Sequence, residues 1–342
     1  MTNRLRNWLV FVALFATVAG ANGQAAPATR TFRGSIGSSH IEMHLNFTGR
    51  TVAGVYAYDH IGEEIKLTGQ VNEQGGLELT EFGTNKKPTG KFLCKRPIDD
   101  PVAADCTWSK PDGTRESFVT LEEQFVDFTK AMQIVPRLIT DRKLGVTVSC
   151  PQIFTKAPAS VAVRNFNSRI LSLTQKAIAD FSPVDGRGVF DTNYTVMLGR
   201  NDLVSVEMSE YYDGGGAHPN NRFWSLTYDL AADKEIKFED LFRPDSDYNT
   251  AVAKYVVADI DRRDQAVEAD NARRENRQPT KREEPIIPMD SLTEISGFAL
   301  TPRGVYVYFD FPHVIAFFDK NFVPYDTIKE HLKPGGPVSR IQ

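Results

Sequence analysis

The sequence holds little cysteine and lacks the short motifs of common enzymes. Three cysteines, Cys94, Cys106 and Cys150, occur among 342 residues. None has a Cys-x-x-Cys neighbour, which argues against zinc sites and thioredoxin-like chemistry. Gly-x-Ser-x-Gly, His-Glu-x-x-His and Ser-x-x-Lys are missing as well, so the common hydrolase signatures are absent. No enzyme class is favoured by motif, and we expect neither a cofactor nor a metal site.

Long apolar runs are also lacking. A membrane-spanning helix needs roughly 20 apolar residues, whereas residues 8–18 form a run of eleven and no later segment is apolar enough. Arg4 and Arg6 precede this run and small residues follow it at 19–23, in the order of a cleavable signal peptide. We therefore expect residues 1–23 to be removed, which leaves a periplasmic or secreted protein without a membrane span. An uncleaved anchor is the alternative.

Basic charge is not in excess. The net charge is −4 at neutral pH, and loss of Arg4 and Arg6 with the signal peptide would lower it to −6. Nucleic-acid binding needs a basic face, so it is not expected. A hydrophobic content of 41% is enough for sizeable cores, and the length suits two domains better than one.

The first predicted domain is rich in short strands. Residues 31–121 alternate polar and apolar side chains in short runs separated by glycine, asparagine and aspartate. This pattern predicts a small antiparallel all-β barrel or sandwich. Cys94 and Cys106 lie twelve residues apart within it, and export permits a disulfide. We predict that these two pair and that Cys150 is a buried free thiol, although pairings through Cys150 stay open.

The second predicted domain, residues 143–334, mixes helices and strands. Residues 160–181 place apolar side chains every three or four positions, as in an amphipathic helix laid on a sheet. Residues 202–212 and 222–230 alternate as strands and should form a hairpin. The whole chain is therefore predicted to be α+β, with helices packed on a mainly antiparallel sheet in this second domain. In a charged insertion at 261–284, fourteen of 24 residues are charged, seven of each sign. This insertion is either a solvated helical extension or a disordered segment.

A glycine-rich loop joins the two hairpin strands and is the most unusual stretch of the chain. His218 stands two residues after three consecutive glycines, and the proline that follows it restricts its backbone. His218 is a candidate general base or metal ligand, with Asp213 or Glu210 as its acidic partner. A metal would need further ligands, and His313 is the one distant histidine in this domain that could join. The structural alternative is a plain turn whose histidine hydrogen-bonds the backbone. The candidate binding residues of the loop are Tyr212, Gly214, Gly215, Gly216, His218 and Asn220.

An ordered set of motifs runs through the second half of the chain. The motifs are Cys-Pro-Gln-Ile at 150–153, Arg-Asn-Phe-Asn-Ser-Arg-Ile at 164–170, Gly-Gly-Ala-His-Pro at 215–219, Leu-Thr-Tyr-Asp-Leu at 226–230, Phe-Pro-His at 311–313 and Val-Pro-Tyr at 323–325. Over residues 143–334 the chain thus resembles the extracellular domain shared by the lysozyme-sensing anti-sigma factor RsiV and the N-terminal part of the peptidoglycan deacetylase PdaC. The charged insertion at 261–284 departs from the usual spacing of that domain.

The resemblance implies an α/β module that acts outside the cell at the wall. In the first case the domain grips lysozyme, and in the second it accompanies a separate catalytic domain. We therefore expect a non-enzymatic envelope binding protein whose partner is an extracellular or periplasmic protein, such as a lysozyme-like enzyme, or peptidoglycan. One alternative is a wall-active hydrolase or deacetylase-type enzyme that uses His218. Another is a structural envelope scaffold without a ligand.

Overall fold

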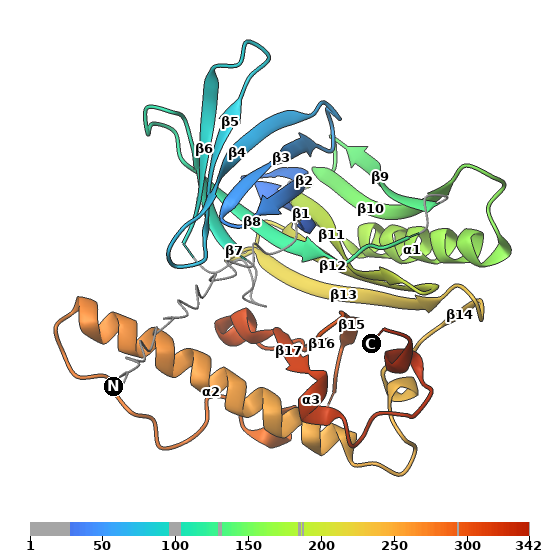
Figure 1. The fold of residues 1–342 in the computed structure, drawn as a ribbon. Coiled ribbons are helices and arrows are strands. Elements are labelled where there is room, and N and C mark those ends of the chain that lie inside the picture. The colour runs from blue at the N-terminus through green and yellow to red at the C-terminus, as the bar shows by residue number, and fades with distance from the viewer. Residues whose placement is uncertain are drawn as a thin grey trace, which may run out of the picture.

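The fold of the chain is α+β, as predicted, with an N-terminal barrel followed by two further sheets and their helices (Figure 1). The computed structural model describes residues 28–95, 104–128, 132–183, 186, 188–292 and 294–341. The predicted signal peptide lies outside the described residues. The boundaries of the two predicted domains stay a prediction.

Eight antiparallel strands form the closed barrel, in which β8 pairs back onto β1. Alternate side chains point inward and are buried, among them Met43, Leu45 and Val52. The strands are β1 (Ala28–Ile36), β2 (Ser39–Thr48), β3 (Thr51–Tyr58), β4 (Ile65–Val71), β5 (Leu77–Phe82), β6 (Pro88–Cys94), β7 (Ala104–Ser109) and β8 (Ser117–Gln124). Of the two predicted architectures, barrel or sandwich, the barrel is the one observed.

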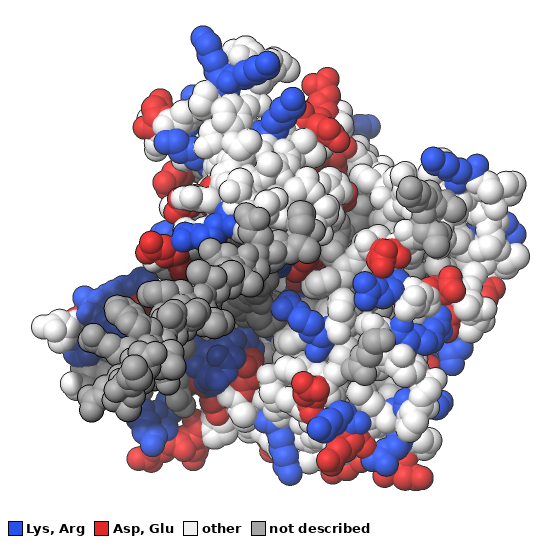
Figure 2. All heavy atoms as spheres, in the orientation of Figure 1, with Lys and Arg blue, Asp and Glu red and all other residues white. Residues whose placement is uncertain are grey.

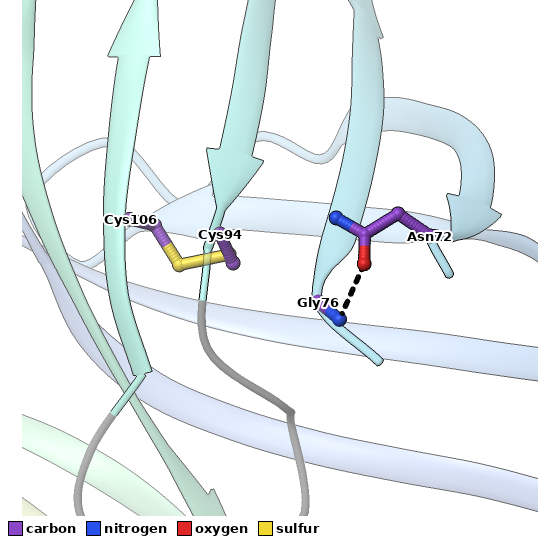
Figure 3. Close-up of a disulfide and its surroundings, with 4 residues drawn as sticks. All are labelled: Asn72, Gly76, Cys94 and Cys106. Atoms are coloured by element: carbon purple, nitrogen blue, oxygen red, sulfur yellow. Dashed lines mark hydrogen bonds between the residues drawn. A yellow bond between two sulfur atoms is a disulfide. The ribbon is translucent and has the colours of Figure 1, made fainter. Parts of the chain in front are cut away.

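The predicted disulfide is present in the barrel wall. Cys94 and Cys106 face each other across the β6–β7 pair and are bonded through their sulfurs (Figure 3). In the nearby turn after β4, the side-chain oxygen of Asn72 accepts a hydrogen bond of 2.8 Å from the backbone N–H of Gly76. Cys150 is free and buried, as predicted.

A six-stranded sheet with the order β14-β13-β12-β11-β10-β9 packs beside the barrel. All its neighbours are antiparallel except β10 and β11. The predicted amphipathic helix is α1 (Val161–Asp180), capped by the hydroxyl of Ser160. Its buried residues, including Phe166 and Ile170, pack on one face of the sheet. The strands are β9 (Met132–Asp141), β10 (Val146–Thr155), β11 (Val189–Arg200), β12 (Leu203–Asp213), β13 (Asn220–Asp229) and β14 (Lys234–Glu235).

Strand β9 is not expected from the sequence, because residues 122–142 show no clear period. In the structure all ten β9 residues pair with β10. β9 is the edge strand of the sheet and most of its side chains are exposed. An edge strand with little burial on either side carries no apolar alternation, so its sequence gives no signal.

A small three-stranded sheet covers the opposite face of the six-stranded sheet from α1 (Figure 1). The edge of β15 is held by side chains of that sheet: Phe298 N–H donates to Ser225 Oγ and Leu300 N–H to Ser205 Oγ, at 2.9 and 2.8 Å. The remaining elements are β15 (Gly297–Leu300), β16 (Gly304–Tyr308), β17 (Lys320–Pro324), α2 (Tyr248–Arg274), α3 (Tyr325–Ile328) and the 3₁₀ helices η2 (Phe238–Leu241), η3 (Met289–Ser291), η4 (His313–Phe318) and η5 (Pro337–Arg340).

The charged insertion is helical in its first half. α2 continues as a helix to Arg274, and the segment after it returns along the helix. Arg277 pairs with Glu268 and Arg282 with Asp264. Lysine, arginine, aspartate and glutamate side chains are also interspersed over the face drawn in Figure 2. Of the helices in the described part of the chain, none has the length and apolar character to cross a membrane.

Candidate functional site

A groove of about 590 Å³ opens where the end of the β12–β13 hairpin meets η4 and the start of β17. It therefore collects residues from two segments about ninety positions apart in sequence. Aromatic rings, amides and acids share its walls. The lining residues are Tyr212, Asn220, Asn221, Arg222, Phe223, Asp310, Phe311, His313, Ala316, Phe317, Asp319 and Lys320.

The glycine-rich loop connects the hairpin strands at one end of this groove, and its tight bend depends on Gly215. The backbone of Gly215 has a φ of +82°, a conformation that favours glycine. Asp213 Oδ1 accepts a hydrogen bond of 2.9 Å from the Gly215 N–H, which fixes the turn. A Cβ at Gly216 would meet open space, and one at Gly214 would make only an ordinary contact. The turn itself thus requires one glycine, and the other two leave the loop without side chains.

His218 and His313 come together although they are far apart in sequence. Their rings stack with centroids 3.6 Å apart and planes 11° from parallel. Since His313 lines the groove, the stack joins the glycine-rich loop to η4 at the groove wall. A metal bound by an imidazole lies in the plane of its ring, so two parallel rings stacked in this way cannot share one ion. Within the described ranges, no group of three or more histidine, cysteine, aspartate or glutamate residues could hold a metal.

The two acids considered as partners of His218 are engaged elsewhere. Glu210 is buried on β12 and accepts hydrogen bonds from Arg222, at 2.7 and 3.0 Å, and from Trp224 Nε1. Asp213 holds the turn at Gly215. Besides its stack on His313, the His218 ring contacts the backbone oxygen of Pro219 through Nδ1, at 3.3 Å. Of the predicted site residues, Tyr212 and Asn220 line the groove and His218 borders it.

Several groove residues were not among the predicted ones. Phe317 on η4 is 72% exposed, and its neighbour Val314 is 80% exposed. The segment Phe-Pro-His-Val-Ile-Ala-Phe-Phe at 311–318 looks like core in the sequence, because it is almost wholly apolar. An exposed aromatic ring at a groove is available to a ligand whose apolar face can cover it. The periodicity of the sequence cannot reveal that Phe317 is exposed, because its exposure depends on how η4 packs against the rest of the fold.

Asp319 is a buried acid in the groove wall. Burial raises its pKa to about 6, against the effect of the hydrogen bond that its carboxylate accepts from Phe311 N–H at 2.9 Å. The nearby charge of Asp310 contributes a smaller part of this rise. An acid with a raised pKa at a groove is more often functional than one on an open surface.

Beneath the groove lies a buried charged cluster formed by Glu122, Glu207, Tyr308 and Lys320. Lys320 donates to Glu122 of the barrel and, at 2.7 to 2.9 Å, to Glu207 of β12. Tyr308 Oη also donates to Glu207, at the Oε2 oxygen that Lys320 contacts. Burial and the neighbouring charge of Glu122 together raise the pKa of Glu207 to about 7, against the lowering effect of Lys320 and of the hydrogen bond from Tyr308. The cluster therefore connects the barrel, the six-stranded sheet and the three-stranded sheet behind one wall of the groove.

Two solved structures resemble the fold. One is a DUF3298 family member from Bacteroides fragilis, 12% identical, with a TM-score of 0.37 over 62% of this chain and 96% of that one. The other is a DUF3298 family protein from Pseudomonas aeruginosa, 18% identical, with a TM-score of 0.38 over 61% of this chain and 96% of that one. No protein-family model matches the chain, and no curated protein matches it.

Two of the motifs that carry the sequence resemblance, at 150–153 and 164–170, have structural roles in β10 and α1. The side-chain amide of Asn167 pairs with both backbone groups of Ile153, accepting from its N–H at 2.8 Å and donating to its carbonyl at 2.9 Å. Gln152 donates to the backbone oxygen of Asn167 at 3.3 Å. Arg169 forms an ion pair with Glu235 at 3.0 Å, which ties the same helix to β14. These residues build the scaffold that carries the hairpin, and the groove lies elsewhere.

Proposed function

We propose that this chain is an exported, non-enzymatic binding protein of the cell envelope and that the groove beside the glycine-rich loop is its binding site. The observation that carries the proposal is the meeting of the hairpin loop and η4. Together they present the exposed ring of Phe317, the amides of Asn220 and Asn221, and the His218–His313 stack. Rings beside a few fixed polar groups are the usual make-up of a ligand site. The ligand would be peptidoglycan or a wall-associated protein such as a lysozyme-like enzyme.

Two features support export. The Cys94–Cys106 disulfide suits an oxidising compartment outside the cytoplasm. The first 23 residues have the charge and hydropathy order of a signal peptide. Export would restrict the ligand to molecules of the envelope, which agrees with the resemblance to a wall-associated domain.

Capture by purified cell-wall sacculi and by immobilised lysozyme tests this function. We expect the wild-type protein to be retained on one of them, and we expect Phe317→Ala and Gly216→Val to be retained at least about tenfold less, since each alters the groove or its bordering loop. The matched control is Phe118→Ala, which removes an exposed ring of the barrel far from the groove residues in sequence. Retention that is unchanged in folded Phe317→Ala and Gly216→Val would remove the groove from the function.

A wall-active hydrolase is the second candidate, and the raised pKa of Asp319 is the observation that favours it. An acid with a pKa of about 6 can act as a general acid near neutral pH. His218, the base considered from the sequence, has no carboxylate among its described contacts. Mass spectrometry of sacculi incubated with the protein would decide: fragments released by the wild type and lost in Asp319→Asn would replace the binding proposal with the enzymatic one.

A further inference from the structure

Both basic side chains that line the groove, Arg222 and Lys320, are already paired with acids. Arg222 is bound to Glu210. Lys320 is bound to Glu122 and Glu207 and is mostly buried. Phosphate-rich and sulfated polymers are recognised through free lysine and arginine side chains. The pairing of both cations therefore disfavours an anionic ligand in this groove.

The side-chain amides of the groove, by contrast, are available to hydrogen-bond a ligand. Asn220 and Asn221 stand at the start of β13, where pairing with Tyr212 and Tyr211 of β12 fixes their backbone. Among the hydrogen bonds of the described residues, none involves either side-chain amide. Each amide offers two donors and one acceptor oxygen. Asp310 and Asp319 add carboxyl oxygens to the lining.

Aromatic rings supply the rest of the surface. Tyr212, Phe223 and Phe311 are half-buried in the groove wall, and Phe317 projects from η4 with 72% of its surface in water. A ring held in this way gains free energy when an apolar face covers it. Sugars offer that combination, because a pyranose has an apolar C–H face and a rim of hydroxyl and amide groups.

We propose that the groove binds an uncharged glycan chain, with Phe317 against the C–H face of a sugar and Asn220 and Asn221 hydrogen-bonded to its polar rim. This inference rests on the proposed function and names the ligand class of the same site. It favours the glycan strand over the peptide or protein components of the envelope. The His218–His313 stack would hold the loop in place at the groove wall, as a positioning element rather than a ligand contact. A groove of about 590 Å³ lies within the usual range for such sites, roughly 300 to 1,000 Å³.

Calorimetric titration of the full chain with soluble tetrasaccharides tests the inference. The probes are the β-1,4-linked tetramer of N-acetylglucosamine and the β-1,4-linked tetramer of glucose. We expect the first to bind, and we expect Phe317→Ala and the double variant Asn220→Ala/Asn221→Ala each to weaken it about tenfold or more. Val314→Ala is the matched control, because Val314 is on the same short helix, is 80% exposed and does not line the groove. The affinity of Val314→Ala for the N-acetylglucosamine tetramer should differ from that of the wild type by less than about twofold.

The two tetramers also separate the groups that are recognised. Tighter binding of the N-acetylglucosamine tetramer would assign the acetamido group to the site, and equal binding would assign the hydroxyl groups. Either result supports a glycan site. If the wild type binds neither tetramer while sacculi or lysozyme still retain it through the groove, the glycan inference is wrong and the proposed function stands. If nothing is retained at all, both are wrong. Binding that survives in both groove variants would also overturn the inference.

Discussion

Arg33 shows how a single residue joins the two halves of the molecule. It lies on β1 of the barrel and is completely buried. Its guanidinium bonds Asp59 of the barrel, Ser149 of β10 at 2.9 Å and Asn193 of β11 at 3.0 Å. It also stacks 3.6 Å over the ring of Tyr194. Since β10 and β11 pair only over Val146–Val148, the arginine reaches the sheet beyond the point where they stop pairing.

Replacing Arg33 with alanine should lower the free energy of unfolding by about 3–5 kcal/mol, because Asp59 would be left buried without its partner. Urea unfolding followed by circular dichroism would measure the change. Arg169→Ala is the control: its ion pair with Glu235 is about half exposed on both sides and should contribute at most about 1 kcal/mol. Equal losses in the two variants would contradict the anchoring role of Arg33.

The sequence alone predicted some residues of the candidate site. Tyr212, His218 and Asn220 were found because three glycines in a row and a His-Pro pair are unusual in any hairpin. Phe317, Asp319 and Lys320 were missed, since an aromatic run and two common charged residues have no distinguishing spacing. The burial of Glu207 has no signal in the sequence either: it alternates with apolar residues along the predicted strand at 202–212, yet it is 2% exposed.

At the scale of elements, the contact between α1 and β10 depends on one side chain. Asn167 pairs with the backbone of Ile153 much as a neighbouring strand would. Asn167→Ala should cost about 1–3 kcal/mol of unfolding free energy, because two partly buried backbone groups lose their partner. Asn165→Ala, on the same helix with an exposed contact to Asp233, should cost less than about 1 kcal/mol. Thermal melting of both variants would test this, and a milder loss in Asn167→Ala than in Asn165→Ala would refute it.

The β6–β7 pair depends on its disulfide in a similar way. Reduction removes a cross-link over twelve residues, which in the chain-entropy view stabilises by about 3 kcal/mol. We expect dithiothreitol to lower the melting temperature of the wild type by several degrees. Cys150→Ala should show the same drop, since its thiol takes no part in the bond. A melting temperature that is insensitive to reductant would contradict the structural importance of the Cys94–Cys106 bond.

At the scale of the whole molecule, the Glu122–Glu207–Lys320 cluster couples three sheets and should respond to pH. The pKa of Glu207 rises from its ordinary value of 4.5 to about 7 in the folded chain. The folded state therefore binds this proton more tightly than the unfolded state does. Stability contributed by protonated Glu207 is fully present below about pH 4.5 and is lost as pH rises to about 7.

Glu207→Gln mimics the protonated form and should be free of this loss. We expect its unfolding free energy, relative to wild type, to increase between pH 5 and pH 7.5 by a few kcal/mol. Urea titrations at both pH values would measure the difference, with Glu235→Gln as an exposed control that should show no such trend. If the unfolding free energy of Glu207→Gln differs from that of the wild type by the same amount at both pH values, the raised pKa of Glu207 is contradicted.

The sequence by itself determined the local features of this protein. Alternation over 31–121 predicted the β-rich first part, cysteine spacing predicted the disulfide, and the apolar period at 160–181 predicted α1, because each depends on residues close together in the chain. Tertiary structure alone decided that the strands close into a barrel, that Glu207 and Arg33 are buried, and that His218 meets His313. Those outcomes depend on how whole sheets pack against one another. The packing brings the hairpin loop beside η4, about ninety residues later in the chain, and so forms the groove.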